Sequence, residues 1–351
     1  MTDREATTPQ HELDDALMRR AVELAARGPL GDPNPRVGAV IADADGQVVG
    51  EGFHQGAGTP HAEVMALRQA GAAARGGTAV VTLEPCAHTG RTGPCATALI
   101  EAGVARVVFA QSDPTPSARG GAVLLEAAGV RTTAGVLAAE SMMLNEAWTF
   151  SCEHGRPKVT WKFAATLDGR SAAADGSSRW ITGPLARDDV HRLRAECDAV
   201  LVGTGTVIAD DPWLTVRTPD GSTTARQPLR VVMGLRQIPD TARVRDQAAP
   251  TLLLATHDPG QALKELAEQD IHHVWLEGGP TVASVFLAAG LVDEVIAYLA
   301  PVLLGSGSPA LGDLGIRTMD QALRLTPHEV TTIGPDIRVR ASIATPNREA
   351  R

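Results

Sequence analysis

The run TLEPCAHTGRTGPC, at Thr82–Cys95, carries two cysteines, Cys86 and Cys95, each directly after a proline. A β-type run predicts a strand over Thr78–Leu83, and the residues over Cys95–Ala102 predict a helix. Each cysteine is therefore expected where a β-type run gives way to a helix, and a helix N-terminus stabilises a thiolate. This stretch predicts an α/β domain with two functional cysteines.

A histidine and a glutamate stand upstream, in His61-Ala62-Glu63. A neutral imidazole and two thiolates suit Zn²⁺, and three protein ligands leave a fourth position open for water. We therefore predict that His61, Cys86 and Cys95 bind zinc. A structural zinc with Cys152 or His88 as its fourth ligand is the alternative.

Glu63 is the candidate general acid/base. Thr59-Pro60 predicts the N-cap and first residue of a helix, which places His61 and Glu63 in its first turn. A carboxylate there can take a proton from a zinc-polarised water and deliver it to a ring nitrogen and a leaving amine. Residues i and i+2 do not share a helical face, so spacing alone does not bring Glu63 to the water.

Length and composition limit the class of protein. The 351 residues predict two domains, and 44% hydrophobic with 21% charged residues is typical of a globular protein with a sizeable core. The net charge of −9 argues against affinity for nucleic-acid phosphates. No run approaches the roughly 18 apolar residues of a membrane helix, and no signal segment begins the chain. We predict a cytoplasmic protein whose cysteines are free or metal-bound.

The first half alternates between helical and β-type patterns. Residues 1–11 are predicted to be disordered, and Asp45-Gly46 predicts a hairpin turn. The further predicted helices cover Leu13–Leu24, a segment from His61, and Gly120–Ala128; the further predicted strands cover Val37–Ala42, Gln47–Phe53, Ala105–Ala110 and Val130–Thr133.

A polar stretch at Ser151–Pro157 is the predicted linker, and the alternation then restarts. Thr218–Gln227 is predicted to be a polar loop. The predicted strands cover Lys158–Ala165, Ala199–Gly203, Leu229–Met233, Thr251–Ala255, His273–Leu276 and Glu294–Leu299; the predicted helices cover Leu185–Ala195, Gln261–Glu268 and Thr281–Ala289. Two α/β domains are therefore expected, meeting near residues 151–157.

Two glycine-rich segments stand out in the second half. The turn Glu277–Thr281 joins a predicted strand to a predicted helix, which is an arrangement that can bind phosphate. Gly203–Thr206 lacks the third glycine of the dinucleotide-binding fingerprint. On spacing alone, plain tight turns are the favoured interpretation of both segments.

The H-x-E…P-C…C pattern is similar to the cytidine-deaminase-like superfamily, although nucleobase deaminases usually show C-x-x-C. The eight residues between the cysteines, with NPRVGAV (Asn34–Val40) and GFHQGAGTPHAE (Gly52–Glu63), resemble the deaminase half of bifunctional riboflavin-biosynthesis enzymes (RibD/RibG type). The segments KVTWKFAATLDGR (158–170), SSRWITG (177–183), 189–217 and LEGGPTV (276–282) resemble the reductase half of the same family.

The resemblance implies a cytidine-deaminase-like three-layer α/β domain over residues 12–152 and a dihydrofolate-reductase-like domain over residues 157–343. The first domain would use Zn²⁺ to deaminate 2,5-diamino-6-(5-phosphoribosylamino)pyrimidin-4(3H)-one. The second would use NADPH to reduce the ribosyl chain of 5-amino-6-(5-phosphoribosylamino)uracil to ribityl, with hydride transfer to C1′. A homo-oligomer is also implied.

The resemblance further implies site residues. In the deaminase, Asn34 and His54 would contact the pyrimidine, and His88 and Arg91 would contact substrate, with Arg91 reaching phosphate. The implied NADPH site comprises Ala164, Trp180, Thr206, Asp210, Gly279, Pro280, Thr281, Val282, Ala283, Ser284 and Val285. The implied substrate residues of the reductase are Ser178, Arg194, Leu214, Arg217 and Glu277.

One segment departs from the family pattern. After the predicted strand Leu229–Met233 the family commonly has a polar residue that contacts NADPH, whereas this chain has Gly234-Leu235-Arg236. That contact stays unassigned. The reductase proton donor is also open, because Asp210-Asp211 could supply the ring oxygen with a proton or could cap a turn beside Pro212.

Two other functions compete with the bifunctional deaminase–reductase. A nucleic-acid or nucleoside deaminase is opposed by the negative charge, the scarcity of aromatic side chains for base stacking, and the long cysteine spacing. A non-catalytic, zinc-stabilised NADP-binding module would leave Glu63 and Arg217 idle. Release of ammonia from the diaminopyrimidine would separate the first function from the others. We expect no nucleic-acid or membrane partner.

Overall fold

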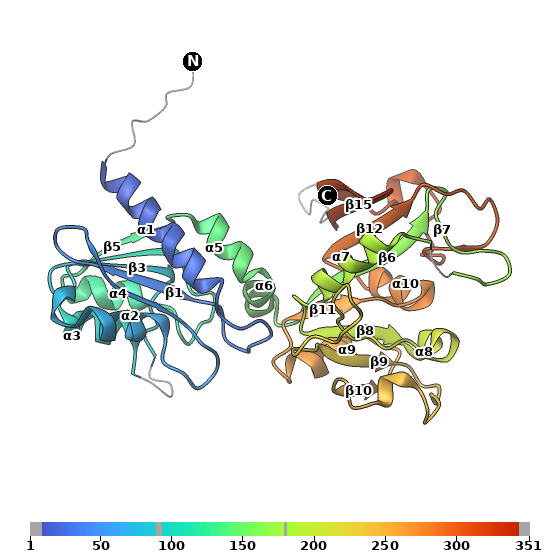
Figure 1. The fold of residues 1–351 in the computed structure, drawn as a ribbon, viewed down its shortest axis with the longest axis horizontal. Helices are drawn as coiled ribbons and strands as arrows, with labels where there is room; N and C mark the ends of the chain where they lie inside the picture. The colour runs from blue at the N-terminus through green and yellow to red at the C-terminus, as the bar shows by residue number, and fades with distance from the viewer. Residues whose placement is uncertain (1–8, 89–92, 179–180, 344–351) are drawn as a thin grey trace, which may run out of the picture. The chain divides into compact units, whose positions relative to one another are not determined.

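The computed structural model describes residues 9–88, 93–178 and 181–343 (Figure 1). Its contacts divide the chain into two units, Met1–Gly155 and Arg156–Arg351. Each unit has its own sheet and its own buried core. No helix within the described ranges is long and apolar enough to cross a membrane.

The first unit has one five-stranded sheet. Its strands are β1 (Gly38–Ala42), β2 (Val48–Phe53), β3 (Thr78–Leu83), β4 (Arg106–Gln111) and β5 (Arg131–Ala134), in the order β2-β1-β3-β4-β5. β1 pairs antiparallel with β2 and β3, whereas β3, β4 and β5 run parallel. The helices are α1 (Pro9–Ala25), α2 (Ala62–Ala70), α3 (Cys95–Ala102), α4 (Gly121–Ala127), α5 (Ala138–Leu144) and α6 (Glu146–His154), with a 3-10 turn at Gly71–Ala74.

Helices cover both faces of this sheet, which gives three layers (Figure 1). Along β1, Ile41 joins the core with α2, α3 and α4, while its neighbour Val40 packs with Leu17 of α1, because successive side chains of a strand point to opposite faces. A Cβ on Gly52 of β2 would lie 2.3 Å from the backbone oxygen of Ala62. Glycine at this position therefore lets the first turn of α2 lie directly on the sheet.

The second unit has an eight-stranded sheet of order β10-β9-β8-β11-β6-β12-β15-β14. The strands are β6 (Lys158–Thr166), β8 (Ala199–Gly203), β9 (Leu229–Met233), β10 (Thr251–Leu254), β11 (His273–Leu276), β12 (Glu294–Ala300), β14 (Leu325–Ile333) and β15 (Asp336–Ile343). The first six strands in spatial order run parallel, and β15 and β14 each run antiparallel to the neighbour before them. β7 (Arg170–Ala172) and β13 (Ser308–Pro309) form a separate pair.

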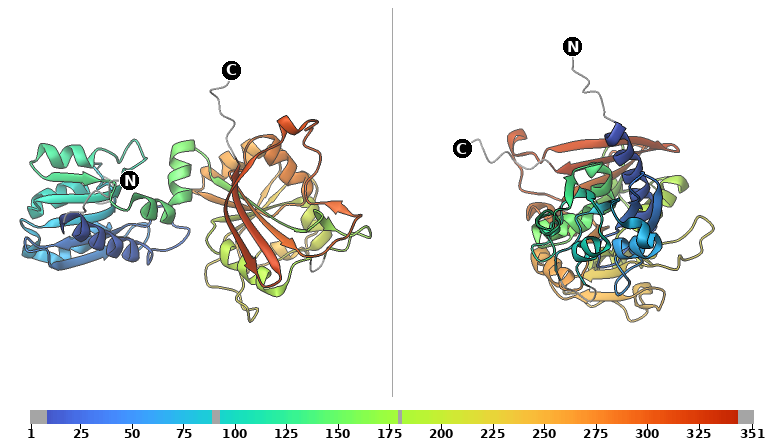
Figure 2. Two further views of the ribbon diagram at one scale, coloured as in Figure 1. Left: turned by 90° about the horizontal axis from the view of Figure 1, so that it is seen from above. Right: turned by 90° about the vertical axis from the view of Figure 1, so that its left-hand side faces the viewer.

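Helices also lie on both faces of the large sheet (Figure 2). They are α7 (Pro184–Arg194), α8 (Thr204–Asp210), α9 (Pro259–Ala267) and α10 (Pro280–Ala288), with 3-10 turns at Arg243–Arg245 and Met319–Gln321. On β8, Leu201 packs with α9 and α10, whereas Val202 packs with α7 and α8. Because β10, β9, β8 and β11 are parallel neighbours, the segments that follow them meet at one edge of the sheet.

Most of the predicted elements are present. The predicted strands over Thr78–Leu83, Ala199–Gly203, Leu229–Met233 and His273–Leu276 have the observed bounds, and so does the helix over Cys95–Ala102. The predicted hairpin is the antiparallel pair β1–β2. The other predicted helices and strands occur with shifted ends.

Some local predictions are wrong. Pro9–His11 were predicted to be disordered but begin α1, where a proline in the first turn is well tolerated; residues 1–8 lie outside the described ranges. The predicted linker begins inside α6, which continues to a left-handed C-cap at Gly155. Gly203–Thr206 is not a simple turn, because α8 begins at Thr204.

The C-terminal pair β14–β15 was not predicted. Pro327 interrupts the β-type pattern of β14, and a proline usually argues against a strand. In the structure, β14 is an edge strand and its register with β15 shifts between Pro327 and Glu329. An edge position with a bulge tolerates the missing N–H.

Candidate active sites

Three possible metal ligands meet in the first unit. The ligand atoms of His61, Cys86 and Cys95 all lie within 4.8 Å of one another. Nδ1 of His61 is 3.1 Å from Sγ of Cys95 and 3.7 Å from Sγ of Cys86. His61 is the N-cap of α2, Cys86 follows β3, and Cys95 is the first residue of α3. The set of one imidazole and two thiols, with this spacing, fits Zn²⁺.

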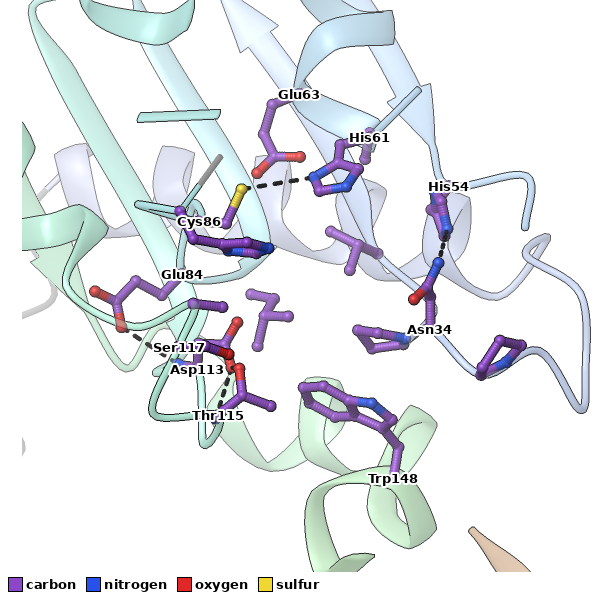
Figure 3. Close-up of a pocket in the computed structure, with 17 residues that line it drawn as sticks. Asn34, His54, His61, Glu63, Glu84, Cys86, Asp113, Thr115, Ser117 and Trp148 are labelled. Carbon is purple, nitrogen blue, oxygen red and sulfur yellow. Dashed lines mark hydrogen bonds between the residues drawn. The ribbon is translucent and has the colours of Figure 1, made fainter. Parts of the chain in front are cut away.

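Two details of the predicted backbone are corrected here. The helix begins at Ala62, so Thr59 is not its N-cap and His61 itself takes that position. Cys86 lies in a loop and not at the start of a helix. Because His61 has an extended backbone, with ψ of 158°, the rule for helical faces does not separate it from Glu63. Figure 3 shows the Glu63 carboxyl group turned towards His61 and Cys86.

Burial controls the charges around these ligands. Glu63 is only 4% exposed, and this burial raises the pKa of its carboxyl group. Hydrogen bonds from the Cys95 thiol and from His61 lower the pKa of Cys86 to about 4, while the same contact raises the pKa of Cys95. The Cys95 amide also donates to Sγ of Cys86 at 3.4 Å.

His61, Cys86 and Glu63 line a cavity of about 330 Å³ that Asn34, His54 and His88 also line (Figure 3). Nδ1 of His54 is 3.3 Å from the Pro60 carbonyl oxygen, so we assign the ring proton to Nδ1. Nε2 then accepts from the Asn34 side-chain amide at 3.2 Å. The Asn34 carbonyl oxygen is thereby left for a ligand in the cavity. Arg91, the other predicted contact, lies outside the described residues.

The far wall of the cavity holds residues that the sequence did not indicate. Asp113, Thr115 and Ser117 come from the loop after β4, and Trp148 comes from α6 (Figure 3). Burial raises the pKa of Asp113. The only available signal was Glu84, which lies inside the cysteine motif.

Glu84 fixes this loop. Its buried carboxylate accepts hydrogen bonds from the backbone amides of Asp113 at 3.2 Å, Gly120 at 3.1 Å and Ala122 at 3.0 Å. The Glu84 side chain therefore ties both ends of the segment between β4 and α4 to the cysteine motif.

The alternative of a structural zinc receives no support. Among the described residues, the group of possible ligands includes neither His88 nor Cys152. Cys152 lies on α6, where burial raises the pKa of its thiol to about 11.

A second polar centre lies at the edge of the large sheet. Arg194 of α7 donates to both carboxylate oxygens of Glu277, at 2.9 and 2.7 Å, and to the Thr215 carbonyl oxygen at 2.7 Å. Burial alone would raise the pKa of Glu277, but the charges of Arg194 and Lys162 lower it to about 2. Burial also lowers the pKa of Lys162, a residue that was not predicted.

His191 connects this centre to Arg217. The Arg217 backbone amide donates to Nδ1 of His191 at 3.3 Å. Burial and the positive charges of Arg194 and Arg217 lower the pKa of His191 to about 4, so both guanidinium groups lie within electrostatic reach of its ring. Arg194, Arg217 and Glu277 are thus brought together. Leu214 lies three residues before Arg217. Its backbone has a φ of 53°, and its side chain is buried in the core.

A cavity of about 460 Å³ lies beside this centre. Six of the predicted NADPH-binding residues line it: Thr206, Asp210, Gly279, Thr281, Val282 and Val285. Gly203 is needed there, because a Cβ would lie 2.6 Å from Cγ2 of Val282. Arg236 and His257 also line the cavity and were not predicted.

The remaining predicted residues are not part of that lining as described. Ala164 is on β6, and Pro280, Ala283 and Ser284 are in α10, where Ala283 is buried in the core. Ser178 is exposed in a loop. Trp180 lies outside the described residues.

Comparisons with known proteins identify a family for each of the two units. Residues 11–111 match the cytidine and deoxycytidylate deaminase zinc-binding region, and residues 157–339 match the RibD C-terminal domain. The chain is 51% identical over 307 residues to the riboflavin biosynthesis protein RibD of Mycobacterium tuberculosis, which covers 87% of this chain and 90% of that protein. It is 44% identical over 359 aligned positions to RibD of Escherichia coli, which covers 92% of this chain and 98% of that protein.

Solved structures extend the comparison. Acinetobacter baumannii RibD matches with a TM-score of 0.85 and 41% identity, over 95% of this chain and 100% of that one. A Thermotoga maritima protein named diaminohydroxyphosphoribosylaminopyrimidine deaminase/5-amino-6-(5-phosphoribosylamino)uracil reductase matches with a TM-score of 0.85 and 34% identity, over 95% and 100% of the two chains.

Proposed function

The chain belongs to the RibD family of bifunctional riboflavin-biosynthesis enzymes, and from this premise we propose the substrate, cofactor and residues of each of its two reactions. The chain is both a deaminase, with a zinc-binding deaminase domain, and a reductase. We assign the deaminase to residues 12–152 and the reductase to residues 157–343. The observation that carries the proposal is that one chain holds both the His61–Cys86–Cys95 centre and the Arg194–Glu277 centre beside a glycine-lined cavity.

The first reaction is hydrolytic deamination of 2,5-diamino-6-(5-phosphoribosylamino)pyrimidin-4(3H)-one. Zinc held by His61, Cys86 and Cys95 would polarise a water molecule and lower its pKa. Glu63 takes a first proton from the attacking water and gives it to the ring nitrogen, and it then takes the second proton from the hydroxyl group so formed and gives it to the departing amine. One C–N bond is replaced by a C=O bond, and ammonia leaves.

The cavity supplies contacts for the pyrimidine. The Asn34 carbonyl oxygen, oriented by the Asn34–His54 hydrogen bond, accepts from an N–H of the ring. Trp148 offers an aromatic face on the far wall. His88 lines the same cavity, and we retain it as a substrate contact, together with Arg91 for the phosphate.

The second reaction reduces the product of the first. NADPH, when bound along Thr206, Asp210 and the segment Gly279–Val285, supplies a hydride to C1′ of the sugar. Arg194 and Glu277 hold the sugar, and Arg217 binds the phosphate. When the ring opens, its oxygen takes up a proton. Lys162 is suited to provide it, because burial lowers the pKa of its ammonium group beside Glu277.

The competing functions receive less support. A nucleic-acid deaminase with an unrelated appendage does not fit a family relationship that spans both units. A non-catalytic module does not fit a buried Glu63 turned towards His61 and Cys86, two of the three proposed zinc ligands. A cytoplasmic location, a homo-oligomer and the absence of nucleic-acid and membrane partners stay predictions.

Product masses test the proposal directly. The purified protein is incubated with the diaminopyrimidine substrate, with and without NADPH, and the products are analysed by mass spectrometry. We expect the deaminated ribosyl compound and ammonia without NADPH, and the ribityl compound with it. Unchanged substrate in both samples would contradict the proposed substrate, and deamination without reduction would contradict the second reaction.

A further inference from the structure

The cavity beside the reductase centre spans the ends of four parallel strands. Gly203 ends β8, and Thr204–Thr206 follow it. Gly279 follows β11, Arg236 follows β9, and His257 follows β10. Since the strand order is β10-β9-β8-β11, these segments line the cavity in that order. Arg236 and His257 therefore lie towards the β10 side of the cavity.

The reacting groups lie towards its other side. Glu277 directly follows β11, and Lys162 is on β6, the next strand of the sheet. A dinucleotide whose nicotinamide reaches this centre must extend its adenosine half along the cavity, past β8 and towards β9 and β10. Its adenosine end then meets Arg236 and His257.

Charge at that end is positive. Arg236 and His257 are the basic side chains among the described residues that line the cavity, and Asp210 of α8 is the acidic one. Both basic side chains are exposed, and no hydrogen bond or ion pair joins either to another residue in the described ranges. Arg194, by contrast, is already engaged by Glu277 and Thr215.

The local backbone brings Arg236 into the cavity. A Cβ built on Gly205 would lie 2.5 Å from Nη2 of Arg236, so the guanidinium group lies against the first turn of α8. Glycine at position 205 leaves room for it. Gly234 in turn lies against Thr204, where a Cβ would be 2.6 Å from Oγ1. The two glycines thus allow the loop after β9 to close on α8.

We propose that Arg236 and His257 bind the 2′-phosphate of NADPH and set the preference for NADPH over NADH. This inference rests on the proposed reductase function. The 2′-phosphate is the group by which the two coenzymes differ, and it is an anion on the adenosine ribose. A guanidinium group donates two parallel hydrogen bonds to phosphate oxygens, and an imidazole adds a third donor.

The test compares the coenzymes in matched variants of the full chain, with the deaminated phosphoribosyl compound as substrate. In Arg236→Ala, kcat/KM for NADPH should fall roughly 10- to 100-fold through KM, because a charged hydrogen bond is lost. The value for NADH should change by less than about twofold, since NADH lacks the phosphate. His257→Ala should lower the NADPH value by roughly 2- to 10-fold.

Arg245→Ala is the matched control, because Arg245 is exposed in the same unit and does not line the cavity. It removes the same charge and should leave both coenzymes unaffected. The binding of adenosine 2′,5′-bisphosphate and of 5′-AMP, measured directly by calorimetry, gives a second readout that needs no hydride transfer. Arg236→Ala should weaken the binding of the bisphosphate and leave the binding of 5′-AMP unchanged.

The outcomes separate this inference from the function on which it rests. If the unmodified protein reduces the substrate with neither coenzyme, the reductase function is wrong. If the unmodified protein uses NADPH, and Arg236→Ala lowers kcat/KM equally for both coenzymes or for neither, the inference alone is overturned. A selective loss of NADPH and of the bisphosphate, with NADH turnover retained, supports it.

Discussion

At His61 one extended backbone conformation determines how two side chains meet. With φ of −65° and ψ of 158°, this residue ends the preceding loop and caps α2. Its imidazole can therefore turn towards Cys86 and Cys95 while Glu63, in the first helical turn, approaches from the helix. A fully helical His61 would direct the two side chains to different faces.

Replacing Glu63 tests its assignment to proton transfer. Glu63→Gln should keep zinc, because Glu63 is not among the three clustered ligand atoms. Deamination should fall by at least about 10²-fold, the typical effect of losing an acid/base group. Zinc content by metal analysis and ammonia release are the measurements. Glu101→Gln, an exposed residue of α3, is the control that should leave both unchanged. Loss of zinc from Glu63→Gln would show that the role is wrong.

Replacing Arg217 tests the phosphate contact. Arg217→Met keeps the aliphatic stem but removes a charged hydrogen bond worth about 1.5–3 kcal/mol, so reductase kcat/KM should fall roughly 10- to 150-fold. Deamination should not change. The critical comparison uses the dephosphorylated substrate, on which the substitution should have much less effect, because both changes remove the same interaction. Equal losses on the two substrates would contradict phosphate binding by Arg217.

Ligand chemistry made some site residues predictable. His61, Cys86 and Cys95 form a recognisable zinc-binding set in the sequence, and the structure brings their atoms together. Glu84 could not be recognised in this way, because it binds amides of Gly120 and Ala122, far along the chain. Only the packed fold shows that Trp148 faces the same cavity.

At the scale of elements, a buried ionic network joins three neighbouring strands. Glu294 of β12 accepts from Lys158 of β6 at 3.3 Å, from Thr160 of β6 at 3.0 Å, and from Arg340 of β15. Burial opposes ionisation of Glu294, but Lys158 and Arg340 lower its pKa from 4.5 to about 2. The charge of Glu294 therefore stabilises the folded sheet.

This network predicts how stability depends on pH. A lowered pKa contributes stability above pH 4.5, and this contribution of about 3 kcal/mol is lost as the pH falls from 4.5 towards 2. Glu294→Gln should therefore be destabilised at pH 7, by an amount that shrinks below pH 4. Urea unfolding followed by tryptophan fluorescence measures this, since Trp161, Trp213 and Trp275 lie in the second unit.

The control for that experiment is Glu268→Gln, at the exposed end of α9. It removes one carboxylate without touching the network, so its stability should follow that of the unmodified protein at every pH. A constant difference between Glu294→Gln and the unmodified protein, from pH 7 to pH 3, would contradict the assigned ionisation.

Strands were predictable where the pattern was local and uninterrupted. β3, β8, β9 and β11 are short, largely buried apolar runs, each paired with at least one parallel neighbour, and their bounds follow from the local residue pattern. β14 has mostly exposed side chains, and it is held by its pairing with β15. Its register depends on that partner, which a local pattern does not contain.

At the scale of the whole molecule, the two units have separate cores. The deaminase core combines residues of β1, β3 and β4 with α2, α3 and α4, and the reductase cores combine the large sheet with α7, α8, α9 and α10. His61, Cys86 and Cys95, the three clustered candidate metal ligands, belong to the first unit. The glycine-lined cavity and the Arg194–Glu277 pair belong to the second. We therefore expect that each reaction can be removed without the other.

Metal removal tests this separation. About one zinc ion per chain is expected by metal analysis, and treatment with a chelator such as dipicolinate should abolish deamination, because two thiolates and an imidazole no longer hold the ion. Reduction of the supplied deaminated compound by NADPH should persist at its original rate, and added Zn²⁺ should restore deamination whereas Mg²⁺ should not, since thiolate ligands select against a hard cation. Glu63→Gln provides the matched comparison, with zinc retained and deamination lost. If reduction declines in step with deamination as zinc is removed, the two sites are not independent. If fully active protein contains no zinc, the metal assignment itself is wrong.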